Sequence, residues 1–277
     1  MEKLLKSFTI WLTDEGKSEN TVKTYHGTLS KFFIWLSEKD RNITNITRED
    51  VQAYMIHLEN LQRSAATIEK AFSAISVYSK FLNRTDIATD ISRLEKEKNT
   101  GAPESLDKTE RNMLLREVES DGDLRNTVIV YTLLHTGIRI SELCALNVSD
   151  IDIKSEQGHI FIRSTSGDIK RVIPLSKDLR SYLTRYIDSL KYKEGALFIS
   201  SVNKRISTRG VQYMLKKYNV NPHKLRHTFC AELVQNGVDL STVADLAGHA
   251  DVNVTKRYIS DPATSTKVEE AINRTFF

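Results

Sequence analysis

Two short segments in the second half of the chain carry pairs of side chains that could take part in chemistry. Arg139 and Glu142 lie three residues apart, on one helical turn, where such a pair is usually a surface ion pair worth less than about 1 kcal/mol. His223 and Arg226 have the same spacing and follow a proline, which is typical of the start of a helix. Free backbone N–H groups there attract anions, and both side chains can donate to a phosphate oxygen.

A zinc site is the metal alternative for the second pair, because His223 and His227 lie four residues apart. Lys224, however, stands where a metalloprotease motif carries its glutamate base, and no cluster of Cys or carboxylates nearby completes a ligand set. We therefore predict no metal. A third segment holds His249 and, nine residues later, Tyr258. Taken singly, a histidine after a glycine and a tyrosine beside a helix are more often packed side chains than site residues.

Taken together and in this order, the segments resemble the active-site motifs of the tyrosine recombinase (phage integrase) family. The resemblance rests on Arg139 with Glu142, the His-x-x-Arg pair at 223 and 226, the Gly-His pair that ends at His249, and the tyrosine nine residues beyond it. It extends over almost the whole chain, because the first part is similar in size and pattern to the family's core-binding domain. The compact length most resembles Xer-like members and transposon-encoded resolvases.

This resemblance implies an enzyme that cuts and rejoins DNA strands at a specific site, without a metal or other cofactor. Tyr258 would attack the scissile phosphate, form a 3′-phosphotyrosyl intermediate and release a 5′-hydroxyl. Arg139 and Arg226 would bind the non-bridging oxygens. His223 would accept the tyrosine proton or bind the phosphate, and His249 would be a further phosphate donor.

One motif departs from the family pattern. Xer-like relatives carry a lysine in a Gly-Lys-Gly hairpin turn, which acts as the general acid. Counting back from the following Arg-x-x-Pro-Leu strand places Ser166 there, or Thr165 after a shift of one residue, and neither can replace a lysine. Lys170 is the candidate if the hairpin differs in length, and the alternative is that no hairpin lysine is used. Glu142 is expected to orient Arg139.

The elements that must position these residues follow from the hydrophobic pattern, which predicts two domains that are mostly helical with a small β-sheet. A helical core-binding domain is expected over residues 1–95, with Ser18 and Thr47 as helix caps. Its apolar residues recur every three or four positions through 4–12, 21–36, 51–58 and 64–82. A charged linker is expected over 96–106.

A mixed catalytic domain is predicted over residues 107–277. Its first helices reach about Leu146, and a hairpin follows with strands at 159–163 and 170–175. Four more helices are expected at 177–190, 209–218, 225–235 and 240–246. After Tyr258 the tail predicts a short helix that, in relatives, packs on a neighbouring protomer; packing on its own domain is the alternative.

The composition fits a DNA-binding protein without requiring one. The 277 residues include 40 Lys+Arg and 36 Asp+Glu, so the net charge is +4 and the pI is near 8.9. This permits a polyanionic partner. No apolar run approaches the ~20 residues of a membrane span, and Cys144 and Cys230 are far apart. We therefore predict a soluble, cytoplasmic protein with two free, buried thiols.

Double-stranded DNA carrying a recombination site is the expected partner. Residues 201–277 hold 11 Lys+Arg and 7 Asp+Glu, so their net charge of +4 equals that of the whole chain. Contacts with the DNA backbone are expected from five cations just ahead of the His-x-x-Arg motif. These are Lys204, Arg205, Arg209, Lys216 and Lys217. The resemblance further implies a homotetramer on DNA, with a dimer at each site and accessory proteins as possible partners.

Two alternative functions remain at this point. A type IB topoisomerase shares the Arg, His and Tyr roles, although length and motif spacing favour the recombinase. A catalytically silent DNA-binding relative would explain the missing hairpin lysine, although an intact Tyr258 with both arginines argues against it. Integration, excision and resolution of mobile elements or replicon dimers are all compatible with the motifs.

Overall fold

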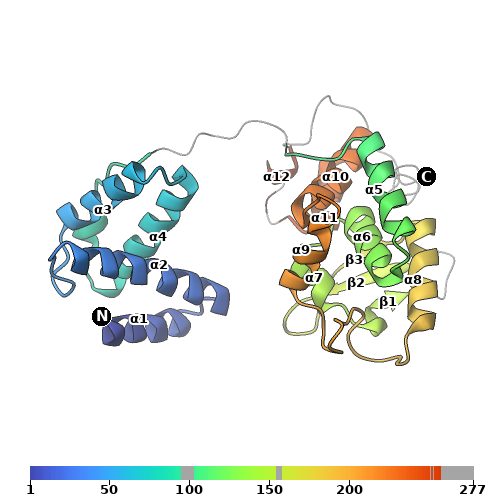
Figure 1. Ribbon diagram of the computed structural model, residues 1–277, viewed down its shortest axis with the longest axis horizontal. Helices are drawn as coiled ribbons and strands as arrows, with labels where there is room; N and C mark the ends of the chain where they lie inside the picture. The colour runs from blue at the N-terminus through green and yellow to red at the C-terminus, as the bar shows by residue number, and fades with distance from the viewer. Residues whose placement is uncertain (95–102, 154–157, 250, 252, 257–277) are drawn as a thin grey trace. The chain divides into compact units, whose positions relative to one another are not determined.

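The computed structural model describes residues 1–94, 103–153, 158–249, 251 and 253–256. The chain divides into two compact units, Met1–Asn99 and Thr100–Phe277 (Figure 1). That division falls within the stretch 96–106, where a linker was expected and of which residues 96–102 lie outside the described ranges. Each unit has its own hydrophobic core.

The first unit is a helical bundle in its described part. Its elements are α1 (Glu2–Asp14), α2 (Glu19–Glu38), α3 (Arg48–Asn60), α4 (Ala65–Phe81) and the 3-10 turn η1 (Thr85–Ala88). Aromatic rings fill its centre, where Tyr78 packs edge-on against Phe8 and Phe33, at centroid distances of 5.2 and 5.3 Å. The predicted caps are confirmed, because Ser18 accepts a hydrogen bond from the third residue of α2 and Thr47 forms a capping box.

The second unit surrounds one helix that is buried on all sides. Residues Thr127–Thr136 of α6 are all buried, and α5, α8 and α10 pack against this helix. The helices and 3-10 turn of this unit are α5 (Lys108–Ser120), α6 (Leu124–Thr136), α7 (Ile140–Ala145), η2 (Val148–Asp150), α8 (Lys177–Ser189), α9 (Thr208–Lys216), α10 (Pro222–Gln235), α11 (Leu240–Ala247) and α12 (Asn253–Lys256).

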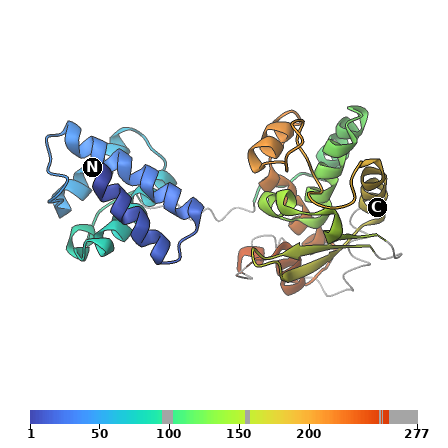
Figure 2. The same ribbon diagram turned by 90° about the horizontal axis from the view of Figure 1, so that it is seen from below.

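A small antiparallel sheet lies beside these helices, with α5 to α7 on one side of it (Figure 2). Its strands pair in the order β1 (Ile151–Asp152), β2 (His159–Arg163) and β3 (Ile169–Pro174). In the β2–β3 hairpin Ile160 pairs with Ile173 and Ile162 with Arg171. Cross-strand partners project from the same face. Arg171 therefore faces the side on which these isoleucines are buried.

Lys170 falls at the irregularity of this hairpin. Arg163 pairs with Ile169 and Ile162 pairs with Arg171, so Lys170 is the extra residue of a bulge on β3. The predicted strands match β2 and nearly match β3, whereas β1, only two residues long, was not predicted. The prediction of a mostly helical, two-part chain with a small sheet is confirmed.

Two further features bear on the composition-based predictions. Cys144 and Cys230 are both buried cysteines outside any disulfide, as predicted. Within the described ranges, no helix combines the length and the apolar character that crossing a membrane requires.

Candidate active site

The junction between α6 and α7 presents Arg139. Gly137 ends α6 with φ +59°, and a Cβ at this position would lie 2.3 Å from a ring carbon of Phe229, so glycine is required here on both counts. Arg139 is the N-cap of α7, and its backbone N–H donates to Glu142 Oε2 at 2.7 Å. Its guanidinium remains accessible, since 45% of the side chain is exposed.

Helix α10 brings Arg226 to the same junction. The Asn221 side chain caps this helix and Pro222 occupies its first turn, as the sequence predicts for a helix start. Arg226 is only 7% exposed, and its Nη1 donates to the carbonyl of Gly137 at 2.6 Å. His223 lies one turn earlier on the same helix and is exposed.

The end of α11 supplies the third part of the site. Gly248 caps the helix with φ +70°, and its carbonyl accepts a hydrogen bond from Arg139 Nη2. His249 follows, with Nδ1 2.8 Å from Oγ1 of the buried Thr255. Burial and the charges of Arg226 and Arg139 lower the pKa of His249 to about 4. Its imidazole is therefore neutral near pH 7.

Arg171 completes the cluster, and the sequence reasoning did not identify it. Its Nη1 and Nη2 both donate to the carboxylate of Glu142 at 2.8 Å, and its Nε donates to the carbonyl of Leu246 at 2.8 Å. A usable signal existed: Arg171 alternates with the apolar Ile173 on the predicted strand. A cation on the inward face of a strand requires a buried partner.

The cluster carries an excess of positive charge. Arg139, Arg171 and Arg226 contribute three positive charges and Glu142 one negative charge, which leaves two. Burial alone would raise the pKa of Glu142, but hydrogen bonds from Arg171 and from the Arg139 backbone lower it below its ordinary value. Burial, followed by the charge of Arg139, lowers the pKa of the Arg226 guanidinium. Bound phosphate would relieve this repulsion.

The structure thus brings together Arg139, Glu142, Arg226 and His249 from segments that lie far apart in the sequence. Tyr258 and the tail helix predicted after it lie outside the described residues. Lys170 is exposed on β3, and its neighbour Arg171 is the β3 side chain that reaches Glu142.

All five predicted DNA-contacting cations are exposed, and two of them also contact protein groups. Lys217 pairs with Asp121 at the end of α5. Arg205 is exposed and also contacts the end of a helix. Its Nη1 donates to the carbonyls of Cys144, Ala145 and Leu146 at the end of α7, at 2.8–3.1 Å, and its Nη2 donates to the side chain of Asn147. Its guanidinium therefore caps the end of α7, and the contact of Arg205 with DNA stays a prediction.

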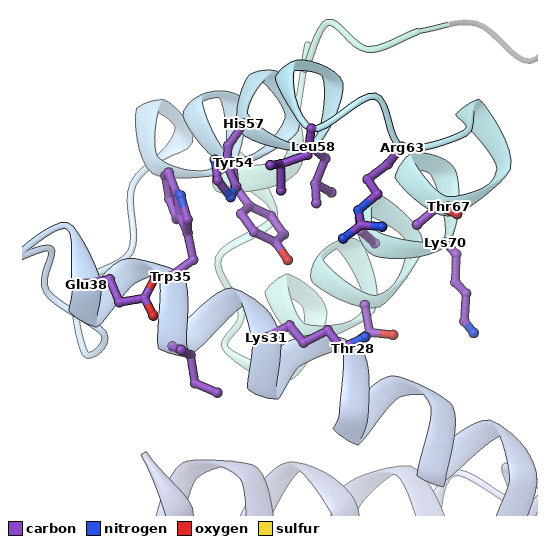
Figure 3. Close-up of a pocket in the computed structure, with 13 residues that line it drawn as sticks. Thr28, Lys31, Trp35, Glu38, Tyr54, His57, Leu58, Arg63, Thr67 and Lys70 are labelled. Carbon is purple, nitrogen blue, oxygen red and sulfur yellow. The ribbon is translucent and has the colours of Figure 1, made fainter.

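The first unit contains a basic groove between α2, α3 and α4, with a cavity of about 440 Å³ (Figure 3). Arg63 and the hydroxyl of Tyr54 point into the hollow, and Lys31 and Lys70 line its sides. The Trp35 indole forms part of the wall, and its buried Nε1 has no hydrogen-bond partner in the described structure. The groove thus combines cations with aromatic surface.

Among the described residues, no group of three or more His, Cys, Asp or Glu side chains is arranged to hold a metal ion.

Comparisons with known proteins cover both units. The phage integrase family matches residues 104–264, and the family described as phage integrase, N-terminal SAM-like domain matches residues 5–86. Tyrosine recombinase XerA of Pyrococcus horikoshii is 31% identical over 281 residues, which is 98% of this chain and 93% of the relative.

Solved structures share the fold. The Tn1549 transposon integrase in complex with circular intermediate DNA matches with a TM-score of 0.72 and 20% identity, over 94% of this chain and 96% of that one. A lambda integrase tetramer bound to a Holliday junction matches with a TM-score of 0.70 and 18% identity, over 94% and 77%.

Proposed function

The chain belongs to the phage integrase family of tyrosine recombinases, and we propose that this site-specific recombinase cuts DNA by bringing the scissile phosphate to Arg139 and Arg226 for attack by Tyr258. The observation that carries the assignment of the site is the convergence of Arg139, Arg226 and His249 from α7, α10 and the end of α11. Three segments that are distant in sequence meet where positive charge is in excess.

The two arginines bind the non-bridging oxygens of the phosphate. One Nη1 donor of Arg226 is directed to Gly137, which leaves the rest of its guanidinium for the anion, and Arg139 retains an exposed side chain. Each stabilises the charge that develops as the phosphate becomes five-coordinate. Losing one such donor costs on the order of 100- to 1,000-fold in rate.

The two histidines have different roles: His249 donates a hydrogen bond to the phosphate, and His223 accepts a proton. With a pKa near 4, His249 enters the reaction neutral. We assign the donor role in its 2.8 Å contact with Thr255 to the hydroxyl, which places the ring proton on Nε2, where it donates to the phosphate. His223 is exposed and accepts the phenolic proton as Tyr258 attacks. The aryl phosphodiester retains the energy of the broken bond for rejoining.

We assign protonation of the leaving 5′-oxygen to Lys170. It is the exposed bulge residue of β3, and its long side chain is flexible. Ser166, at the position of the family lysine, hydrogen-bonds Ser164 and Asp168 within the turn and has no acidic proton to give. A 5′-bridging sulfur, which leaves without a proton, restores cleavage by Lys170→Ala if this assignment is right. Failure of that rescue removes Lys170 as the acid.

DNA contacts extend over both units in this proposal. Lys204, Arg209 and Lys216 bind backbone phosphates beside the catalytic cluster. In the first unit, the rim of the basic groove does the same. Its cations are Lys31, Arg63 and Lys70.

The assembly follows the relatives. The lambda integrase structure is a tetramer on a Holliday junction, and we propose that four copies of this chain act on two recombination sites, two at each site. The cytoplasmic location predicted from the sequence belongs to the same proposal, and accessory proteins are left open by it.

The test begins with duplexes selected by binding from a random pool. The selected duplexes are then offered with a nick near the centre, so that a cleaved strand is lost and the covalent intermediate accumulates. Wild type should give an SDS-resistant protein–DNA band, and Tyr258→Phe should bind equally well and give none. An adduct with the mutant means that another residue attacks, and binding by wild type without any adduct favours the silent DNA-binding relative.

A further inference from the structure

We propose that Arg171 is a positioning residue for strand cleavage, which acts by occupying Glu142 so that Arg139 stays free for the phosphate. This inference rests on the proposed function, because it gives Arg139 the phosphate as its partner. Arg171 itself is 12% exposed and directs its donors to protein groups, so it acts through its neighbours.

Two arginines share the carboxylate of Glu142 unequally. Arg171 makes two parallel bonds to it, both of 2.8 Å, whereas the nearest contact from the Arg139 side chain is 3.4 Å. Bidentate guanidinium–carboxylate pairs are the stronger and more directional arrangement. The Glu142 carboxylate is therefore paired mainly with the Arg171 guanidinium. It also accepts a hydrogen bond of 2.7 Å from the backbone N–H of Arg139, which holds the start of α7 in place.

Removing Arg171 would release that carboxylate next to a second guanidinium. Glu142 could then close the 3.4 Å gap and bind Arg139 in place of Arg171. The guanidinium would be drawn from the position where it meets the scissile phosphate, and an oxygen of that phosphate would have to compete with a partly buried carboxylate. Arg171 thus prevents Glu142 from acting as an internal competitor of DNA.

Arg171 also fixes the segment that carries His249. Its Nε donates to the carbonyl of Leu246 in the last turn of α11, and a Cβ on Gly248 would lie 2.7 Å from its Nη1. Arg139 donates to the carbonyl of the same glycine. One side chain from β3 therefore links α7 and the end of α11, which hold two of the groups assigned to the phosphate.

A lysine cannot reproduce this arrangement. The ammonium group is a single point of charge, whereas the Arg171 guanidinium addresses the two oxygens of Glu142 and the Leu246 carbonyl at once. Arg171→Lys is therefore expected to retain the positive charge and to lose part of the effect.

The experiment compares cleavage with binding on the selected nicked duplex. Single-turnover rates of adduct formation are measured for wild type, R171A, R171K, E142Q, R139A, R171A/E142Q and R139A/R171A, alongside duplex affinities. R171A should bind within a few-fold of wild type and cleave about 100-fold more slowly, as expected when a misplaced group disturbs the reacting geometry. R171K should fall between R171A and wild type.

Two double variants separate positioning from a merely structural role. R171A/E142Q should cleave faster than R171A at a temperature where both variants are fully folded, because a neutral amide no longer competes for Arg139. Recovery that only follows a higher unfolding midpoint, as the uncompensated Glu142 charge is removed, would indicate a structural role. R139A/R171A should be slower than R139A by a much smaller factor than R171A is slower than wild type, because only the contribution through the His249 segment remains to be lost. Should R171A fail to fold, R171K and R171K/E142Q carry the same comparison.

The failing outcomes differ. Cleavage by R171A at the wild-type rate would overturn the inference and leave the proposed function intact. So would a rate loss in R139A/R171A equal to the product of the losses in the two single variants. Wild-type cleavage by R139A would instead overturn the proposed function.

Discussion

Replacing Gly248 with alanine should impair cleavage more than any generic loss of stability explains. The position combines a left-handed backbone, φ +70°, with two guanidiniums at its surface. An alanine in this conformation costs about 1–2 kcal/mol, of which roughly 0.4–1 kcal/mol is returned by the stiffer unfolded chain. The backbone contribution is thus about 1 kcal/mol.

The new Cβ adds a steric cost that the backbone does not. It would lie 2.7 Å from Nη1 and 2.9 Å from Cζ of Arg171, and 3.2 Å from Nη1 of Arg139. Arg171 is held by bonds to Glu142 and Leu246, so it gives way only by losing at least one charge-assisted hydrogen bond, worth about 1.5–3 kcal/mol. The expected total for Gly248→Ala is about 3 kcal/mol.

Gly122→Ala is the matched control. Gly122 lies in the same unit with φ +72°, and a Cβ there would have no heavy atom within 4 Å. It should therefore show the backbone cost alone. A difference of about 2 kcal/mol between the two variants corresponds to roughly 4–8 °C in midpoint for a unit of this size.

Thermal unfolding and adduct formation on the nicked duplex are measured for both variants. Gly122→Ala should cleave at the wild-type rate, and Gly248→Ala should lose about 100- to 1,000-fold, the cost of one misplaced phosphate donor. Equal midpoints together with equal cleavage rates would refute the reasoning, because the packing of both arginines against Gly248 would then carry no energy.

Two further predictions concern charge. Because the pKa of His249 lies near 4 in the folded chain and near 6.5 when unfolded, it contributes stability above pH 6.5 that is lost as the pH falls toward 4; His135, with a pKa near 3, acts in the same direction. In His249→Gln, the free energy of unfolding measured by denaturant titration should depend less on pH over this range. Bound duplex should raise the His249 pKa in an NMR titration. An unmoved pKa would mean that no phosphate approaches the ring. Lys216→Ala should reduce the slope of log affinity for duplex against log salt by about 0.9. Lys217→Ala should leave the slope near wild type, because Lys217 pairs with Asp121; equal changes would mean that Lys217 leaves Asp121 to bind a phosphate.

The contacts that begin helices in this chain could be predicted closely from its sequence. The cap at Ser18, the capping box at Thr47 and the proline at the start of α10 all involve partners within four residues, and each lies where its pattern indicates. The motif residues Arg139, Arg226 and His249 were likewise recognisable by type and order, although their mutual contacts were not.

The contacts that sequence reasoning missed are non-local or depend on register. Arg205 resembles a surface cation in a basic stretch, but its partners are carbonyls about 60 residues earlier. Lys170 and Arg171 are neighbours with similar charge, and only strand pairing with its bulge determines which of them faces the cluster. A shift of one residue in β3 would exchange their positions.

The hydrogen bond from Arg226 to Gly137 has an entropic consequence for DNA recognition. A free surface arginine loses up to about 2 kcal/mol of rotamer entropy when it is immobilised on a ligand. Arg226 is nearly buried and already tethered, so that loss is incurred when the chain folds. The arriving phosphate meets a guanidinium whose orientation is set, and more of the contact energy remains available for affinity. Arg139 is also tethered, to the carbonyl of Gly248, but its side chain is half exposed and retains more of that freedom to lose when DNA binds.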